Sequence, residues 1–417
     1  MKQRLQILND PRFHLVYGVT QRFTEAPFPS RVRLNREGRT LADGVKKKAT
    51  VHPGMLLAEH PSLEKGDLFS PIHGIITDIN ERSIFVSAAD PAPDAPQVEP
   101  VDLISTDIWG EELVVRLKKM GLNTRSLGQR CKTLIINGLN PDPGVTWAEP
   151  MLLSHVHNME VGLELLHRIG WVERVILAVP TGMHVSYQGV EVAHVSPEYP
   201  MSLDPMVKRA VTGQENPADV GIVGLHNLWS LGRVGRTGLP LTETVITIGN
   251  YTRSHNYIVK EGSTIGELLQ FADIPLHAGD TVVRGGPLRG EAIDRLDRSV
   301  TKGSTGVFVV DAGAIPPMKG HSPCVNCSAC VMVCPARLNP STLSRYAEFA
   351  HHESCRRENI DCCMGCGLCG YVCPARRPVL QYIRLAQAKL QEIDRTRQLV
   401  EITPASREQD AGKTAQQ

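Results

Sequence analysis

The spacing of hydrophobic and polar positions changes along this chain, and the changes predict several domains. Up to about residue 90, short runs rich in β-branched residues, such as VRLNREG and GDLFSPIHGIITDI, are separated by Gly, Pro and Asn. That pattern is typical of β-hairpins. The proline-rich stretch DPAPDAPQVEP (90–100) then predicts a linker. We therefore expect an N-terminal β domain over residues 1–95.

Beyond residue 103, strand and helix patterns alternate. EELVVRLKKMG and the long segment AEPMLLSHVHNMEVGLELLHRIG have helical spacing, whereas KTLIING, RVILAVP and ETVITIGN are short apolar strands. Such alternation predicts an α/β domain with a mostly parallel sheet, here over residues 103–250. A small mixed β domain is expected over residues 251–315. Within it, Thr264 and Glu267 have the spacing of a capping box at a helix start.

The last predicted domain covers residues 318–400 and contains two cysteine-rich blocks. Between the blocks we expect a helix with Asn339 as its N-cap and Pro340 at its first position. After the second block, PVLQYIRLAQAKLQEIDR repeats apolar residues at helical spacing. Residues 403–417 are polar and are expected to form a disordered tail.

The overall composition is that of a globular protein. The 417 residues carry a net charge of +1 and are 41% hydrophobic, so no global charge favours nucleic acid or an anionic membrane as partner. No apolar run approaches the roughly 20 residues that cross a bilayer. The start, MKQRLQILNDPRFHLV, lacks the apolar core of a signal peptide. We expect a soluble protein, or one held to a membrane by partner proteins.

Ten of the 11 cysteines lie between Cys324 and Cys373, in two blocks of the form C-x2-C-x2-C-x3-C-P plus two further residues. In two-cluster ferredoxins with this spacing, the fourth cysteine of each block ligates the cluster of the other block. The sequence therefore predicts two [4Fe–4S] clusters. The first is held by Cys324, Cys327, Cys330 and Cys373, and the second by Cys363, Cys366, Cys369 and Cys334.

A zinc site is the alternative, but zinc sites need only four ligands, from paired C-x2-C knuckles. Eight cysteines in two matched blocks favour iron–sulfur clusters. Cys355 and Cys362 are left over, and Cys362 as a substitute ligand is a further alternative. Cys131 stands alone and is expected to be a buried apolar residue. The blocks contain no acid, base or nucleophile for substrate turnover, so electron transfer is the expected chemistry.

Along nearly its whole length the sequence resembles the RnfC family, whose members are components of the Rnf electron-transport complex. SPIHGIITDI resembles that family's barrel-sandwich hybrid domain, and KTLIINGLNPDPG with ADVGIVGLHNLWSL resembles its flavin/NADH-type domain. VVRGGPLRG followed by VTKGSTGVFVV is similar to its SLBB-type β-grasp domain, and the cysteine blocks resemble its dicluster module. The resemblance implies an α/β multidomain fold: a β barrel-sandwich hybrid, a Rossmann-like α/β domain, a β-grasp domain and an α-helical dicluster ferredoxin domain.

The resemblance also implies a peripheral protein on the cytoplasmic side of the inner membrane. Its complex couples electron transfer between ferredoxin and NADH to the movement of Na+ or H+. Other membrane and iron–sulfur subunits of the complex would be the partners and would provide the membrane contact. A cytochrome or a ferredoxin is a candidate redox partner. Typical members of the family bind FMN and NADH on the α/β domain.

This sequence departs from the family where those nucleotides bind. The family's GGAGFPT-like stretch corresponds here to MGLNTRSLGQRCKT (120–133), whose only glycines are Gly121 and Gly128, and Asn140 replaces the first acid of the next loop. Glycines let backbone N–H groups approach phosphates. The side chains present instead disfavour bound FMN and NADH, so we expect the α/β domain to be a scaffold or docking surface. An NADH-oxidising FMN protein with a divergent loop is the alternative function, and a scaffold that its clusters merely stabilise is a third.

Four other features favour structural roles. GGPLRG (285–290) is expected to be a glycine-dependent turn, although it could contact a phosphate. His73 occupies the place of a lipoyl hairpin tip, but no lysine is there to be lipoylated. His226 and Asn227 could line a nucleotide pocket, but polar roles in the core or on the surface are favoured. His351 and His352 are expected on a helix surface rather than at a haem or a metal.

Overall fold

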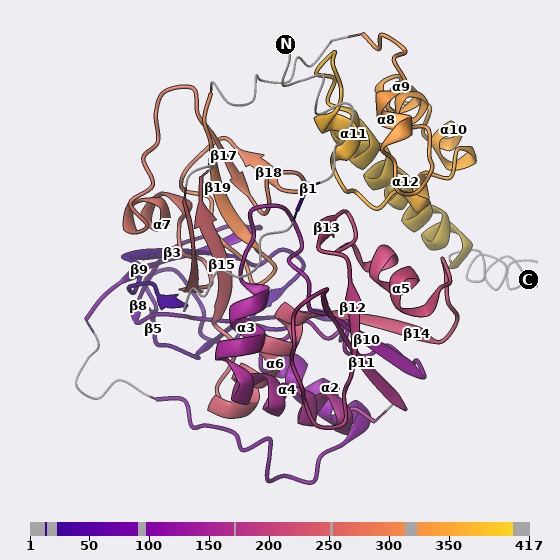
Figure 1. Cartoon of the computed structure of the whole chain (residues 1–417). Helices are drawn as coiled ribbons and strands as arrows, with labels where there is room; N and C mark the ends of the chain where they lie inside the picture. The colour runs from indigo at the N-terminus through magenta and orange to yellow at the C-terminus, as the bar shows by residue number, and fades with distance from the viewer. Residues whose placement is uncertain are drawn as a thin grey trace, which may run out of the picture. The chain divides into compact units, whose positions relative to one another are not determined.

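The computed structural model describes residues 13–14, 23–90, 97–170, 172–250, 253–312 and 323–402. These residues form a mixed α/β protein with several sheets and helices (Figure 1). The chain divides into two compact units, one of residues 12–315 and one of residues 1–11 with 316–417. The tail predicted over 403–417 and most of the predicted linker, residues 91–96, lie outside the described residues. None of the helices in the described ranges has the length and apolar character needed to cross a bilayer.

Residues 31–88 are built from antiparallel strands, as the sequence pattern predicts, whereas β2 (Thr24–Glu25) pairs in parallel with a strand of another sheet. One sheet has the order β3 (Arg31–Asn35), β9 (Ser83–Ala88), β8 (Gly74–Ile79) and β5 (Thr50–Val51). A second sheet has the order β4 (Thr40–Leu41), β6 (Leu56–Glu59) and β7 (Leu68–Phe69). Val32 and Leu34 alternate with more exposed neighbours along β3 and face a shared core.

The predicted parallel sheet is present, with the order β12 (Glu191–Val195), β11 (Arg174–Pro180), β10 (Thr133–Asn137) and β14 (Val220–Gly224). Alternate residues of β10 are buried on opposite faces. Leu134 and Ile136 belong to the larger core and Ile135 to the smaller one. Because the strand order reverses between β10 and β14, this is the point where open α/β sheets bind ligands.

Helices lie on both faces of this sheet. α2 (Gly110–Lys119), α3 (Ala148–Ser154), α4 (Val156–Arg168) and α6 (Leu225–Thr237) contribute to the larger core, and α5 (Asp204–Thr212) contributes to the smaller one. The single long helix predicted over 148–170 is divided into α3 and α4 at His155, which has a non-helical backbone. α4 and α6 pack closely because Gly232 presents no side chain to Asn158. A Cβ there would lie 1.8 Å from the Asn158 carbonyl oxygen.

The strand predicted from ETVITIGN is observed as β15 (Glu243–Gly249), but it does not lie in the parallel sheet. It belongs to a six-stranded mixed sheet with the order β18 (Glu291–Ile293), β17 (Thr281–Arg284), β19 (Gly306–Val310), β15, β16 (Ser254–Lys260) and β2 (Thr24–Glu25). α7 (Ile265–Phe271) packs on this sheet, and the Thr264 hydroxyl caps it by accepting from Glu267 N, as predicted. A separate pair joins β1 (Phe13–His14) and β13 (Glu198–Tyr199).

The cysteine-bearing unit is helical. Its elements are α8 (Ala329–Met332), α9 (Pro340–Glu348), α10 (His352–Arg357), the 3-10 helix η1 (Ile360–Cys362), α11 (Leu368–Tyr371) and α12 (Val379–Ile402). Asn339 caps α9 through a bond from Thr342 N, as predicted. α11 and α12 begin 39 residues after α8 and α9, the same shift that separates Cys324 from Cys363. The two halves are therefore structural repeats.

Candidate functional site

Each cysteine block folds as a tight loop that runs into a one-turn helix. Each loop has two residues in the left-handed backbone conformation: Asn326 and Ser328 in the first block, and Gly365 and Gly367 in the second. These residues occupy equivalent repeat positions, so the two loops turn in the same way. The third cysteine of each block lies in the short helix that follows and is buried: Cys330 in α8 and Cys369 in α11.

The first predicted ligand set comes together in the structure. Burial raises the pKa of the Cys330 thiol, and the neighbouring thiols of Cys324, Cys327 and Cys373 raise it further. Cys373 belongs to the other block, so the structure brings a cysteine of the second block near Cys330. This set is partly open to solvent. Cys327 is exposed, and Val325 and Met332 are 60% and 84% exposed.

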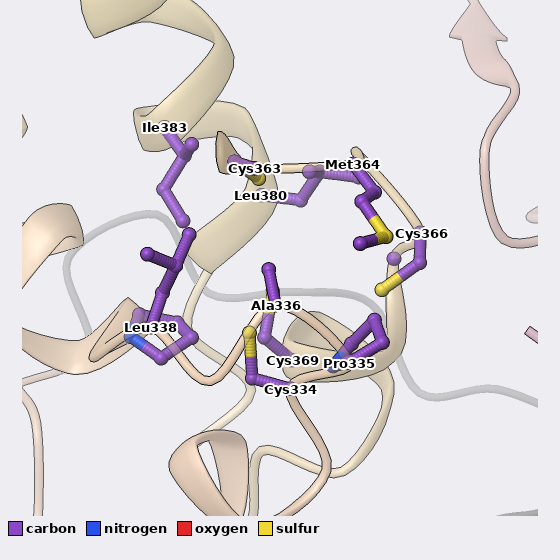
Figure 2. A pocket seen from close by; sticks show the side chains of 12 residues that line it. Cys334, Pro335, Ala336, Leu338, Cys363, Met364, Cys366, Cys369, Leu380 and Ile383 are labelled. Atoms are coloured by element: carbon purple, nitrogen blue, oxygen red, sulfur yellow. The ribbon is translucent and has the colours of Figure 1, made fainter. Parts of the chain in front are cut away.

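The second set surrounds a cavity. Cys334 of the first block lines it together with Cys363, Cys366 and Cys369 of the second (Figure 2). The sulfur atoms of Cys334 and Cys366 point into it from different sides (Figure 2). The rest of the wall is apolar or glycine: Pro335, Ala336, Leu338, Pro340, Met364, Gly367, Leu380 and Ile383. The four thiols are spread around the wall of the cavity and do not converge on one position. Among the described residues, no group of three or more His, Cys, Asp or Glu side chains converges on a single metal-ion position.

The electrostatics of this cavity bear on what it can hold. Burial raises the pKa of the Cys366 thiol to about 11, and burial also raises the pKa of Cys369 and of Cys363. Thiols in such surroundings stay protonated at neutral pH unless a metal displaces the proton. Four sulfur donors around an apolar space form the donor set that a [4Fe–4S] cluster requires. The residues present therefore fit that group.

The two sets are neighbours. Cys330 of the first set acts electrostatically on the buried thiol of Cys369 in the second. The remaining two cysteines of the unit have separate environments. Cys355 is fully buried and its thiol lies 3.7 Å from the Leu343 carbonyl oxygen, while Cys362 is exposed in η1. Cys131 is buried in the core of the α/β segment, as predicted.

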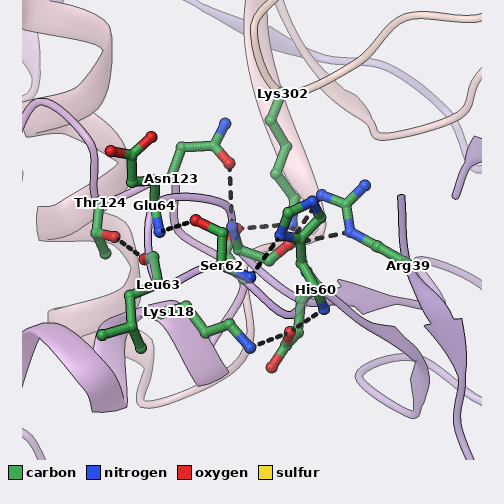
Figure 3. Close-up of polar contacts among 12 residues, drawn as sticks. Arg39, His60, Ser62, Leu63, Glu64, Lys118, Asn123, Thr124 and Lys302 are labelled. Carbon is green, nitrogen blue, oxygen red and sulfur yellow. Dashed lines mark hydrogen bonds and ion pairs between the residues drawn. The ribbon is translucent and has the colours of Figure 1, made fainter. Parts of the chain in front are cut away.

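The stretch 120–133, whose side chains are expected to disfavour a bound nucleotide, makes contacts within the protein itself. Gly121 is left-handed, and its carbonyl oxygen accepts from the buried Lys302 ammonium at 2.8 Å (Figure 3). Gly66 packs against Gly121 so closely that a Cβ on Gly66 would lie 2.3 Å from the Gly121 carbonyl carbon. Gly66 therefore leaves no room for a side chain, and the two chain segments pack closely there.

Further buried charges hold the same junction together. The Asp67 carboxylate pairs with Lys118 at 2.7 Å, and Lys302 pairs with Glu261 at 3.4 Å. Arg39 donates to the Gly66 carbonyl oxygen at 2.8 Å (Figure 3). Burial lowers the pKa of Lys302, and the carboxylate of Glu261 opposes that shift. The sequence did not reveal this network, because its members are spread over more than 200 residues of the chain.

The rest of the stretch 120–133 covers β14 and the start of α6. The Gln129 amide donates to the Ile222 carbonyl oxygen at 3.0 Å and accepts from the Ile222 N–H at 3.2 Å. The Asn227 amide donates to the Ser126 hydroxyl at 2.8 Å. Side chains of the stretch 120–133 thus occupy the outer edge of β14, away from β10, and reach the first turn of α6.

The next loop is also closed by internal contacts. Asn140 accepts from Ala148 N, at the first residue of α3, at 3.0 Å. The buried Asp142 carboxylate accepts from the backbone N–H groups of Leu288 and Arg289 at 3.1 and 2.9 Å. Those donors belong to GGPLRG, and a Cβ on Gly286 would lie 2.1 Å from the Asp142 carboxyl carbon. The prediction of a glycine-dependent turn is confirmed. The two backbone N–H groups of this turn already donate to a carboxylate of the protein.

The histidines singled out in the sequence have structural positions. The half-buried His226 ring lies 2.9 Å from the Thr244 hydroxyl, and the loss of solvent around it lowers its pKa to about 4. His73 is half-buried in the turn before β8 and its carbonyl accepts from Ala89 N. His351 is exposed just before α10, and His352 is half-buried at its first residue.

Comparison with known proteins identifies a set of relatives. No family model matches the chain. It is 32% identical over 282 residues to the RnfC component of the ion-translocating oxidoreductase complex of Erwinia tasmaniensis, and the match covers 63% of this chain and 35% of that protein. The protein of the same name from Rhodobacter capsulatus is 26% identical over 412 residues, covering 88% of this chain and 79% of the relative. The corresponding component of the proton-translocating ferredoxin:NAD(+) oxidoreductase complex of Clostridium ljungdahlii is 29% identical over 280 residues, covering 63% and 61%.

Proposed function

We propose that this chain, a homologue of the RnfC components of ion-translocating oxidoreductase complexes, is a peripheral electron-transfer subunit of such a complex. The observation that carries the proposal is the apolar cavity walled by one cysteine of the first block and three of the second. A [4Fe–4S] cluster, when bound, supplies one-electron transfer. The chain contributes the thiol ligands and, around the second set, an apolar cavity wall.

Two ligand sets follow from the proposal. The first cluster would be held by Cys324, Cys327, Cys330 and Cys373. The second would be held by Cys363, Cys366, Cys369 and Cys334. The neighbours of the Cys330 and Cys366 thiols support both sets. The electrostatic effect of Cys330 on the Cys369 thiol supports two neighbouring sites, and a short path between them would favour electron transfer.

The domain assignment is part of the proposal. Residues 1–95 would form the barrel-sandwich hybrid domain, 103–250 the Rossmann-like domain, 251–315 the β-grasp domain and 318–400 the ferredoxin-like domain. The two antiparallel sheets, the parallel sheet, the mixed sheet and the helical unit support this order. The membership of β15 in the mixed sheet favours an earlier boundary, before Glu243, between the second and third domains.

We infer further that the chain does not use NADH itself and binds no FMN. The internal hydrogen bonds of Gln129, Ser126 and Asp142, in the two loops where the family resemblance would place a nucleotide, support this inference. A ferredoxin, a cytochrome or another protein of the complex would then be the redox partner. The complex would hold the chain against the cytoplasmic side of the membrane through its other subunits, and the α/β domain would be a docking surface.

Iron and acid-labile sulfide analysis of the purified chain tests the central proposal. Two four-iron clusters predict about eight irons per chain. Cys366→Ser should lower that number, because it removes a buried ligand of the second set. Cys362→Ser is the matched control, since Cys362 is exposed and neighbours a proposed ligand. A protein that binds only zinc, or that loses as much iron in the control as in Cys366→Ser, would contradict the proposal.

NADH-driven dye reduction by the iron-loaded protein separates the two functions that the relatives suggest. The closed loops predict no reduction of the dye, with or without added FMN. A flavin-dependent activity that disappears when residues 120–144 are altered would support the alternative, an NADH-oxidising FMN protein. The Clostridium relative, whose complex is named for ferredoxin and NAD(+), makes that alternative worth the test.

A further inference from the structure

The two cysteine loops differ in how far they are exposed to solvent. In the first loop Cys327 and Ser328 are exposed, whereas their equivalents in the second loop, Cys366 and Gly367, are buried. Met332 of α8 is 84% exposed, more than any other large apolar side chain in the described part of the chain. Both loops make the same backbone turn, so the difference arises from what covers each loop.

The second loop is covered by the wall of its cavity. Met364 lies between the first two cysteines of the second block and lines the cavity, as does Leu380 of α12 (Figure 2). At the equivalent positions of the first repeat stand Val325, which is 60% exposed, and the smaller polar residue Ser341. The second set is therefore enclosed, whereas the first set is open to solvent.

Of the eight proposed ligands, all of which lie in the described part of the chain, the exposed one is Cys327 of the first set. A one-electron carrier must come close to a cluster before it can exchange an electron with it, and the first set allows that approach. α8, which carries Cys330, contacts α11, which carries Cys369, so the two sets are neighbours. An electron that reaches the first set can therefore pass on to the second.

We propose that one-electron carriers from outside this chain exchange electrons with the first set, and that the second set is reached only through the first. The inference rests on the two-cluster function proposed above. The carrier gives up one electron, which passes to the first cluster and then to the second, and the reverse steps return it. No bond is made or broken. The chain provides the opening at Cys327 and the apolar wall that closes the second cavity.

Stopped-flow reduction of the full-length, iron-loaded chain by two small donors of opposite charge tests where electrons enter. The donors are the methyl viologen radical cation and the radical anion that dithionite releases. A change in cluster potential affects both donors alike, so the ratio of their rates reports on the charge at the entry point. Residues 323–336 contain no charged side chain, so one introduced charge stands alone in this segment.

At low salt, Met332→Lys should lower the ratio of the cation rate to the anion rate about fourfold, and Met332→Glu should raise it by a similar factor. Val325→Lys and Val325→Glu repeat the measurement at a second exposed position. Phe349→Lys is the matched control, because Phe349 is 69% exposed and lies at the far end of α9 from the first block. Asp361→Asn changes one charge beside the second block. Neither of these two variants should change the ratio.

A dysprosium chelate in solution provides a readout that needs no electron transfer. The chelate accelerates the spin relaxation of centres near the surface, so electron paramagnetic resonance should show faster relaxation for the first reduced cluster than for the second. Cys327→Ser alters or removes the signal of the first cluster and so identifies it. Equal or faster relaxation of the second signal, a rate ratio that does not respond at Met332 and Val325, or an equal response in a control variant would overturn the inference. A wild-type chain without about eight irons would refute the proposed function instead.

Discussion

At the scale of single residues, His226 couples the stability of the larger unit to pH. Its folded-state pKa is about 4, against an ordinary value of 6.5, because its half-buried ring has lost solvent beside Thr244. The unfolded chain therefore binds a proton more readily, and folding stability is fully present above pH 6.5 and falls as the pH drops toward 4. The shift corresponds to a loss on the order of 3 kcal/mol.

The measurement is the free energy of unfolding at pH 7 and pH 5, followed by tryptophan fluorescence. His226→Gln can still bond to Thr244 but does not titrate, so its stability should change less between the two pH values than that of the wild type. His167→Gln, at an exposed position on α4, should behave like the wild type. An equal pH dependence in His226→Gln and the wild type would show that His226 is not the titrating group.

Gly286 is required by the closed loop. Gly286→Ala would place a methyl group within 2.1 Å of the Asp142 carboxyl carbon, so the carboxylate must move away from its two backbone donors. We expect a loss of roughly 3 kcal/mol in denaturant unfolding of the larger unit. Gly303→Ala is the control, because a Cβ there meets nothing within 4 Å, and its effect should stay within about 0.5 kcal/mol. If Gly286→Ala lost no more stability than Gly303→Ala, the loop would adapt to the added methyl group without strain.

At the scale of elements, Arg377 connects α9 to the start of α12. Its buried guanidinium bonds to the Ser344 hydroxyl at 3.1 Å, pairs with Glu348 at 2.5 Å and lies over the Tyr382 ring. The first repeat has Leu338 at the equivalent position. Arg377→Ala leaves the half-buried Glu348 without this partner, and should destabilise the cysteine-bearing unit by about 3 kcal/mol.

Loss of the cluster absorption during denaturation reports on that unit. The midpoint should fall in Arg377→Ala and stay nearly constant in Arg345→Ala, which changes an exposed arginine of α9. If both variants unfold at the wild-type midpoint, the ion pair does not hold α9 to α12.

The elements that the sequence predicted correctly are those set by local chemistry. The caps at Thr264 and Asn339 depend on residues three positions apart, and strands such as β10 follow from short apolar runs. The sheet to which β15 belongs is set by its pairing with two strands. β16 follows it directly in the sequence, whereas β19 lies far along the chain. Periodicity describes one segment and not its partner, so the pattern placed β15 in the wrong sheet.

At the scale of the whole molecule, the candidate site was predictable because it is a repeat. Two identical spacings 39 residues apart predicted the exchange of Cys334 and Cys373 between sets, and the structure places Cys373 near Cys330 and Cys334 near Cys366. The closure of the loop 120–133 was expected from missing glycines, but its cause lies in long-range partners such as Lys302 and Asn227.

The two compact units have separate hydrophobic cores, and this predicts separate responses to the loss of iron. Leu343, Ile383 and Leu390 belong to the core that contains Cys330 and Cys369, whereas Trp147 and Trp229 belong to the core of the larger unit. All four tryptophans of the chain precede residue 230, so tryptophan fluorescence reports on the larger unit alone. A metal that binds only to the folded protein adds its binding free energy to the stability of the fold. Removing iron should therefore destabilise the cysteine-bearing unit.

We therefore expect a chelator under reducing conditions to abolish the visible absorption and to leave the tryptophan-detected unfolding midpoint unchanged. Loss of protection from proteolysis should be confined to residues after 316, which mass spectrometry of the fragments can establish. The variant Cys366→Ser, which lacks a proposed ligand, should show this proteolysis before any chelator is added. A fall of the tryptophan midpoint on iron removal would mean that the larger unit depends on the clusters for its own stability.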